Sequence, residues 1–274
     1  MNSIPAEIIA SSSPFRFLVG PNQREFIIYS ALFAHQSPVF EKLVNGNFSE
    51  STEKCVQWKS VDEDTFICFW QYTHTGRYTA ASPVIGLKSE SEATCEPPPP
   101  SPPSPTFAAF FGTTAAKKDE TPPKELTKRE IQWNEFRKQR ASVNFGAFRS
   151  TGGLFGSRVR SNYAHEDYTN HFLLHARIYV FAECYGITGL MDLSLNELHG
   201  TLVRFTLYKE RINDVVALIR YCYENLVPEP LREVVALYSA CKLEKLWLSE
   251  EFHALVEAYG ELSKTLFGLI VNVL

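Results

Sequence analysis

Residues 15–29, FRFLVGPNQREFIIY, predict two strands joined by a tight turn. Phe15, Phe17 and Val19 recur at every second position, which is the spacing of side chains on one face of a strand. Residues 20–23, GPNQ, are turn formers. A strand hairpin therefore opens the ordered part of the chain.

Residues 37–50, SPVFEKLVNGNFSE, predict a short helix with a defined start and end. Ser37 is a favourable N-cap and Pro38 a favourable first helical residue. Gly46 is expected to end the helix in the left-handed conformation. The apolar side chains of this helix are expected to form a stripe of four residues, Val39, Phe40, Leu43 and Val44.

The loop after this helix places the aromatic residue Phe48 and the carboxylate Glu50 close together. Two interpretations are open. Phe48 either folds back into the core as a plug, or forms a contact with a partner together with Glu50. The plug is the favoured interpretation, because loops after helices commonly return one apolar residue to the core.

Residues 55–61 predict a short strand, and a second helix follows it. Asp62 is the expected N-cap of that helix and Gly76 lies just beyond its expected end. Its inner face is predicted to consist of Phe66, Phe69, Trp70 and Thr73.

The middle of the chain, residues 80–162, is predicted to be a mostly disordered linker. Its N-terminal part is rich in proline and its C-terminal part is rich in Gly, Ser and Arg. Neither part has enough apolar surface to offset the entropy cost of ordering the chain. Residues 124–140 interrupt it with a possible short helix, in which Trp133 and Phe136 recur at helical spacing. This helix is expected to dock either on its own protein or on a partner.

The composition limits the class of protein. A net charge of -4 argues against a nucleic-acid-binding domain, which is usually basic. The six cysteines include no CxxC pair, which is typical of reduced thiols and indicates the cytoplasm or the nucleus. Neither a signal peptide nor an apolar run long enough to span a membrane is visible.

No catalytic motif is recognisable in the sequence. GxGxxG, P-loop, GxSxG and HExxH patterns are absent. His171 and His175 are four residues apart and could share a metal, but a single pair supplies too few ligands, so packed or hydrogen-bonded histidines are expected. We therefore expect no enzyme, no cofactor and no metal site.

The order of these segments resembles the BTB/POZ family. The first half of the resemblance consists of FIIYSALFAHQSPVF, NGNFSES, VDEDTF and YTHTGRY, and the second half of LLHARIYVFAECYGITGL. A long proline-rich insertion between the halves is similar to the fungal branch of the family. The implied fold is α+β, with helices around a short sheet over residues 14–79 and 163–205 and a helical extension over residues 206–274.

The resemblance implies a non-enzymatic protein–protein interaction module that associates with itself. Some family members are adaptors that dock on the cullin scaffold of a ubiquitin ligase through a hydrophobic residue, any residue and then Glu after this same helix. Phe48 and Glu50 match that pattern, and the exposed parts of Val39 and Leu43 would complete the surface. An alternative function is a nuclear, nucleic-acid-associated factor that uses the BTB-like domain as a dimeriser and the basic linker for binding.

Overall fold

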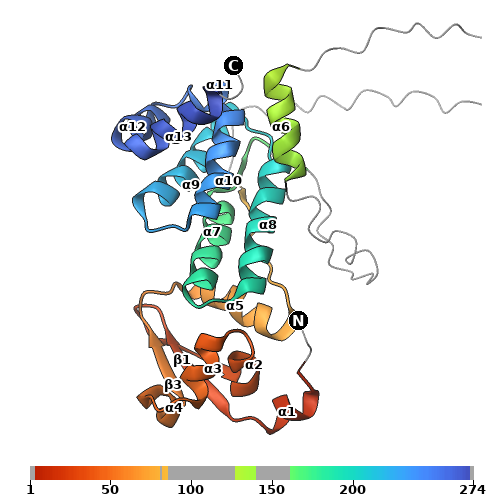
Figure 1. Ribbon diagram of the computed structural model, residues 1–274, viewed down its shortest axis with the longest axis vertical. Helices are drawn as coiled ribbons and strands as arrows, with labels where there is room; N and C mark the ends of the chain where they lie inside the picture. Colours follow the sequence, from red (N-terminus) through yellow and green to blue (C-terminus); the bar gives the residue numbers. More distant parts are fainter. Residues whose placement is uncertain (1–3, 81, 86–126, 140–160, 272–274) are drawn as a thin grey trace, which may run out of the picture.

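The structure is a computed structural model that describes residues 4–80, 82–85, 127–139 and 161–271. These ranges leave out most of the predicted disordered linker. They also leave out most of the basic residues that the alternative, nucleic-acid-associated function would use for binding. The fold is α+β and mostly helical, with a short sheet. Figure 1 shows two tiers, with the three-stranded sheet at the bottom and most of the C-terminal helices at the top.

The lower tier is built on the predicted hairpin. Strands β1 (Pro14–Val19) and β2 (Arg24–Tyr29) are antiparallel, and β3 (Cys55–Trp58) pairs with β1 in parallel, giving the order β2-β1-β3. The turn between β1 and β2 uses Gly20 at φ 73° and Gln23 at φ 51°. The predicted alternation in β1 is confirmed, because Phe15, Phe17 and Val19 are fully buried.

Short helices surround this sheet. They are α1 (Ala6–Ser11), α2 (Ser30–Ala34), α3 (Pro38–Asn45), α4 (Ser49–Glu53) and α5 (Glu63–Thr75). The aromatic side chains of α2, α3 and α5 hold these three helices on the sheet: Phe33 of α2 stacks on Phe40 of α3 with ring centroids 4.2 Å apart, and Phe17 of β1 meets Phe33 edge-on. Aromatic pairs prefer particular ring arrangements. They therefore orient the helices and also bury apolar area.

Two of the predicted helix starts are confirmed. The Ser37 hydroxyl accepts a hydrogen bond from the backbone N–H of Phe40, and the Asp62 carboxylate accepts one from that of Thr65. Each satisfies one of the N–H groups that a helix start leaves without an intrahelical partner.

Two other local predictions are wrong. Gly46 has φ -80° and ψ -178°, which is extended backbone rather than a left-handed stop. Trp70 does not belong to the buried face of α5, because its ring is partly exposed and its indole N–H donates to the Ile27 carbonyl at the edge of β2.

The two ends of the insertion meet in a small second sheet. Strand β4 (Val84–Ile85) pairs in antiparallel orientation with β5 (Glu166–Asp167), so that Ile85 lies opposite Glu166. The chain therefore leaves the fold and returns to it at nearly the same place.

Helices α7 (Thr169–Cys184) and α8 (Thr188–Arg204) connect the tiers, and Figure 1 shows them running side by side from bottom to top. The predicted stop between them is confirmed, since Gly186 has φ 67°. The lower part of α7 packs into the aromatic core of the sheet through Ile178 and Phe181, whereas Phe172 packs into the upper core.

The upper tier is a helical cluster. It consists of α9 (Ile212–Glu224), α10 (Glu229–Cys241), α11 (Leu243–Leu246), α12 (Glu250–Ala258), α13 (Gly260–Val271) and the 3₁₀ turn η2 (Lys209–Arg211). Helix α6 (Lys128–Lys138) from the insertion joins this cluster. A capping box between Thr127 and Glu130 starts α6, so the described helix is shorter than the predicted 124–140.

Adjacent residues of α3 give a direct test of this packing. We expect Phe40→Ala to lower the free energy of unfolding by about 3–5 kcal/mol, because it removes a fully buried ring from the aromatic core. Val39→Ala is the matched control and is expected to change it by about 0.5 kcal/mol or less, because Val39 is exposed. Urea unfolding followed by circular dichroism measures both, and equal losses would contradict the described orientation of α3.

Candidate protein-interaction surface

One face of α3 carries an exposed apolar stripe. Val39, Leu43 and Gly46 follow one another at positions i, i+4 and i+7, so they share one side of the helix and its end. Val39 is 47% exposed and Leu43 is half-buried. The opposite side of α3 is held in the core by Phe40 and Val44, so the stripe is presented in a fixed orientation.

The ring of Phe48 extends this stripe. A Cβ atom placed on Gly46 would lie 3.1 Å from Cδ2 of Phe48 and only 2.3 Å from the carbonyl oxygen of Lys42. Gly46 is therefore required here because it leaves room for the Phe48 ring and the Lys42 carbonyl, and not because of its backbone angles. We name Val39, Leu43, Phe48 and Glu50 the α3–α4 surface.

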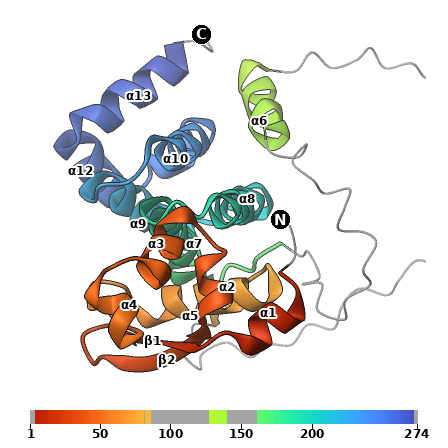
Figure 2. The same cartoon turned by 60° about the horizontal axis from the view of Figure 1, so that its bottom comes forward.

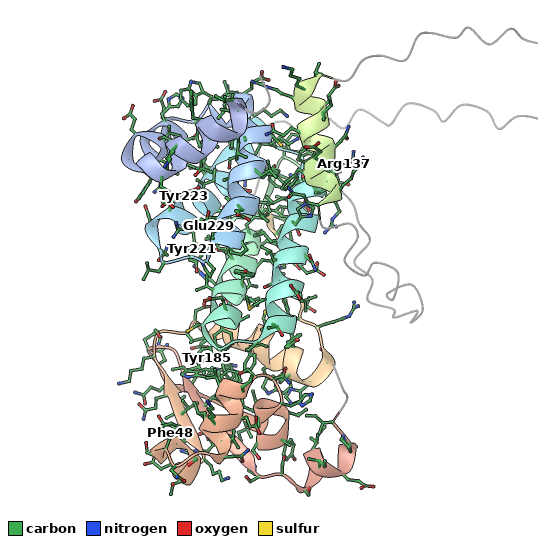
Figure 3. All side chains as sticks on the ribbon, viewed as in Figure 1. Phe48, Arg137, Tyr185, Tyr221, Tyr223 and Glu229 are labelled. Carbon is green, nitrogen blue, oxygen red and sulfur yellow. The ribbon has the colours of Figure 1, made fainter. Side chains whose placement is uncertain are left out.

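Phe48 is 58% exposed, so the plug interpretation is wrong. The reason is helix α4, which the sequence analysis treated as loop: Phe48 stands at its N-cap with extended backbone. The Ser51 hydroxyl donates to the carbonyl oxygens of Gly46 and Phe48 at 2.6 and 2.7 Å, which fixes the loop. Phe48 consequently points away from the core at the rim of the lower tier (Figure 3).

Glu50 lies beside Phe48 in the first turn of α4. Its carboxylate accepts a hydrogen bond from the Ser49 hydroxyl at 3.1 Å, and the residue is half-buried. An acidic residue in a first helical turn is favoured by the helix dipole. The α3–α4 surface thus combines an apolar strip with one carboxylate, which suits a partner with an apolar anchor pocket and a hydrogen-bond donor beside it.

The two other residues predicted to bind a partner lie in the upper tier, away from the α3–α4 surface. Phe136 is fully buried, which corrects the expectation that its side chain meets an external partner. It packs against Tyr238 with ring centroids 5.8 Å apart. Trp133 is partly buried on the same cluster, and the Lys242 ammonium lies 3.5 Å from its ring centroid. Of the two docking alternatives, the structure has the intramolecular one.

The two histidines of α7 form a hydrogen-bonded chain with Tyr78, as the sequence analysis expected for packed histidines. The Tyr78 hydroxyl oxygen is 2.6 Å from Nδ1 of His175, and Nε2 of His175 is 3.3 Å from Nε2 of His171. Burial, followed by the nearby His171 and Arg204, holds the pKa of His175 well below its ordinary value. Within the described part of the chain, no group of three or more His, Cys, Asp or Glu side chains is placed to hold a metal ion.

A hollow of about 700 Å³ that was not predicted from the sequence adjoins the start of α3. Its apolar lining includes Ile8 of α1, Ala31 and Ala34 of α2, and Pro38. The hollow depends on α1, whose short sequence has no strong helical pattern. No signal in the sequence pointed to it.

No protein-family model matches the chain, and no curated protein is significantly similar to it. None of the helices within residues 4–80, 82–85, 127–139 and 161–271 combines the length and the apolar character needed to cross a membrane.

The buried His175 predicts a pH-dependent stability. In the unfolded chain this histidine takes up a proton near pH ~6.5, whereas in the fold it stays neutral to a lower pH. The unfolded state then binds more protons, so acidification below this value should lower the free energy of unfolding by up to about 1.4 kcal/mol per pH unit. Urea unfolding at pH ~7 and pH ~5 should give a smaller loss for His175→Gln than for the wild type.

Asp214 provides the internal comparison for this experiment. Burial raises its pKa to about 6, so its contribution has the opposite sign: it is present at low pH and lost as the pH rises through that value. This contribution is common to the wild type and His175→Gln and cancels in their difference. Identical pH profiles for the two proteins would contradict the assigned role of His175.

Proposed function

We propose that the protein is a non-enzymatic protein–protein interaction module of the BTB/POZ type. The observation that carries this proposal is that the two halves of the resemblance, residues 14–79 and 163–205, share one hydrophobic core although the insertion separates them in sequence. A resemblance due to chance would not be expected to bring both halves into one packed body.

The contacts between the halves are specific. Phe181 of α7 meets Trp58 of β3 and Phe69 of α5 with ring centroids 5.5 and 5.1 Å apart. Tyr185, after α7, meets Phe40 of α3 at 5.1 Å. The pairing of β4, which follows the first half, with β5 of the second half adds a backbone contact. The aromatic contacts therefore join α3, β3 and α5 of the first half to α7 and Tyr185 of the second.

The α3–α4 surface is the proposed partner site. Its support is the exposure of Phe48 and Val39 close to the carboxylate of Glu50, since apolar patches rimmed by polar groups mark protein interaction sites. The narrower proposal is that the module is an adaptor and that this surface docks on the cullin scaffold of a ubiquitin ligase. The sequence Phe48-Ser49-Glu50 has the order hydrophobic residue, any residue, glutamate. This order supports cullin as the proposed partner.

A pull-down with cullin compares the wild type with Phe48→Ala and Glu50→Ala. We expect Phe48→Ala to weaken binding by about tenfold to a hundredfold, because central aromatic anchors dominate interface energies, and Glu50→Ala to weaken it less. Leu248→Ala is the matched control, because Leu248 is also exposed but lies between α11 and α12. Circular dichroism should show that Phe48→Ala remains folded.

Two outcomes would contradict the adaptor proposal. One is that the wild type does not bind cullin at all. The other is that Phe48→Ala and Leu248→Ala bind equally well, which would place the contact elsewhere. Unfolding of Phe48→Ala would contradict the exposed position of the ring instead, so the two failures are distinguishable.

Self-association is the second part of the proposed function. Multi-angle light scattering over a range of concentrations should give a mass above that of the 31.1 kDa chain. Phe48→Ala should self-associate like the wild type, if the α3–α4 surface serves a different partner. A strict monomer at the highest concentration would count against self-association and leave the adaptor test unaffected.

A further inference from the structure

Helix α6 is not packed like the other helices of the upper tier. Residues 86–126 separate it from β4 and residues 140–160 separate it from residue 161, so its neighbours in space are remote in sequence. It stands on the outer side of α8 and α10, as Figure 2 shows. A polar contact also reaches α13, where the Gln132 side-chain amide donates to the Leu269 carbonyl at 3.3 Å.

The contacts of α6 follow one helical face. Arg129, Gln132, Trp133 and Phe136 occupy positions i, i+3, i+4 and i+7, and only Gln132 and Phe136 are buried. Arg129 forms an ion pair with Glu244. A few anchors on one face, with ion pairs at the edge, are the pattern of an amphipathic helix bound in a groove.

Side chains of α8 and of the end of α10 contact these residues of α6. Tyr238 of α10 contacts both aromatic rings, and Lys242 lies over the Trp133 ring. Nε2 of the buried His199 in α8 lies 2.7 Å from the Phe136 carbonyl oxygen. A carbonyl only accepts, so this nitrogen carries the proton and donates to a carbonyl in the last turn of α6. His199 thus binds the C-terminal turn of a helix, where backbone carbonyl groups lack intrahelical N–H partners.

Two features of the groove are not used by α6. The Tyr238 hydroxyl is buried and finds no hydrogen-bond partner among the described residues, so an occupant with a polar group at this position would satisfy it. A hollow of about 630 Å³ also adjoins Gln139, just after the end of α6. Its lining is apolar at Val234, Leu237 and Leu269 and acidic at Asp192 and Glu233.

We propose that the groove between α8, α10 and α13 is a binding site for an amphipathic helix of a partner protein and that α6 is its intramolecular competitor. The partner helix carries the pattern Arg-x-x-Gln-Trp-x-x-Phe or a close equivalent. It continues beyond the position of Gln139 with further apolar residues and with lysine or arginine. These fill the hollow and face Asp192 and Glu233.

The covalent connection of α6 to the rest of the chain determines how readily a partner helix replaces it. A segment joined to its own site acts at an effective concentration in the millimolar range. With an affinity of about 10 μM of the free α6 segment for the groove, a millimolar effective concentration weakens any competing helix by their ratio, about a hundredfold, in the wild type. Weakening α6 should open the site without any change in the groove itself.

The test uses the full-length chain and a fluorescent peptide of residues 127–139. The variant Trp133→Ala/Phe136→Ala lacks the anchors of α6 but keeps the groove. Fluorescence anisotropy should show the peptide binding to this variant about a hundredfold more tightly than to the wild type. Ile131→Ala is the matched control, because Ile131 is an exposed residue of α6 that is not an anchor, and it should behave like the wild type.

A second peptide extends the first by two helical turns with leucine and lysine facing the hollow, and it should bind the variant more tightly. Equal binding of the shorter peptide to the wild type and the variant would overturn the proposal, as would no binding to a folded variant. A peptide with both anchors replaced by alanine should not bind. No gain from the extended peptide would remove the hollow from the proposed site.

A cleavable chain keeps the proposal testable if the double variant fails to fold. Protease sites in 86–126 and in 140–160 leave α6 docked during folding and free it from both tethers after cleavage. The labelled peptide should then replace the cleaved segment while circular dichroism stays unchanged. A segment that leaves only when the chain unfolds would show that α6 is an integral part of the core.

Discussion

The rest of the structure depends on the burial of α7 on nearly all of its sides. A helix that is apolar all round is stable only when other elements surround it. Phe172 and Tyr179 face the upper core, whereas Ile178 and Phe181 face the lower one. Helix α7 is therefore the common wall of two cores, and the helices after residue 206 cover surface that the lower tier leaves open. Removing them would expose a buried face of α7, which explains why the chain continues as packed helices rather than as a tail.

The aromatic core of the lower tier determines what the surface presents. Phe33, Phe40 and Trp58 fix α3 against the sheet from one side. Because α3 cannot rotate without breaking these contacts, Val39 and Leu43 must remain on the outer side. The position of Phe48 follows from the same constraint through Gly46, whose missing side chain leaves space for the ring. A rigid core of this kind presents the apolar strip in one conformation, which lowers the entropy cost of binding a partner.

Local signals predicted much of this fold, and tertiary contacts decided the rest. The alternation of β1 and the caps Ser37 and Asp62 involve interactions within a few residues, so the sequence pattern was sufficient for them. The conformation of Gly46 and the exposure of Phe48 depend on α4, a helix of five residues with no apolar stripe. The burial of Phe136 depends on Tyr238 and His199, which are remote in sequence. Single-sequence patterns carry no information on such pairs, so the groove of α6 was not predictable.

The pairing of β4 with β5 has a consequence for how such a chain changes over evolutionary time. The insertion begins and ends on neighbouring strands, so its two ends are joined whatever lies between them. Closing a loop costs free energy that grows only with the logarithm of its length, by about 0.6 kcal/mol for each doubling. Sequence added between β4 and α6, or between α6 and β5, therefore costs little additional free energy of loop closure.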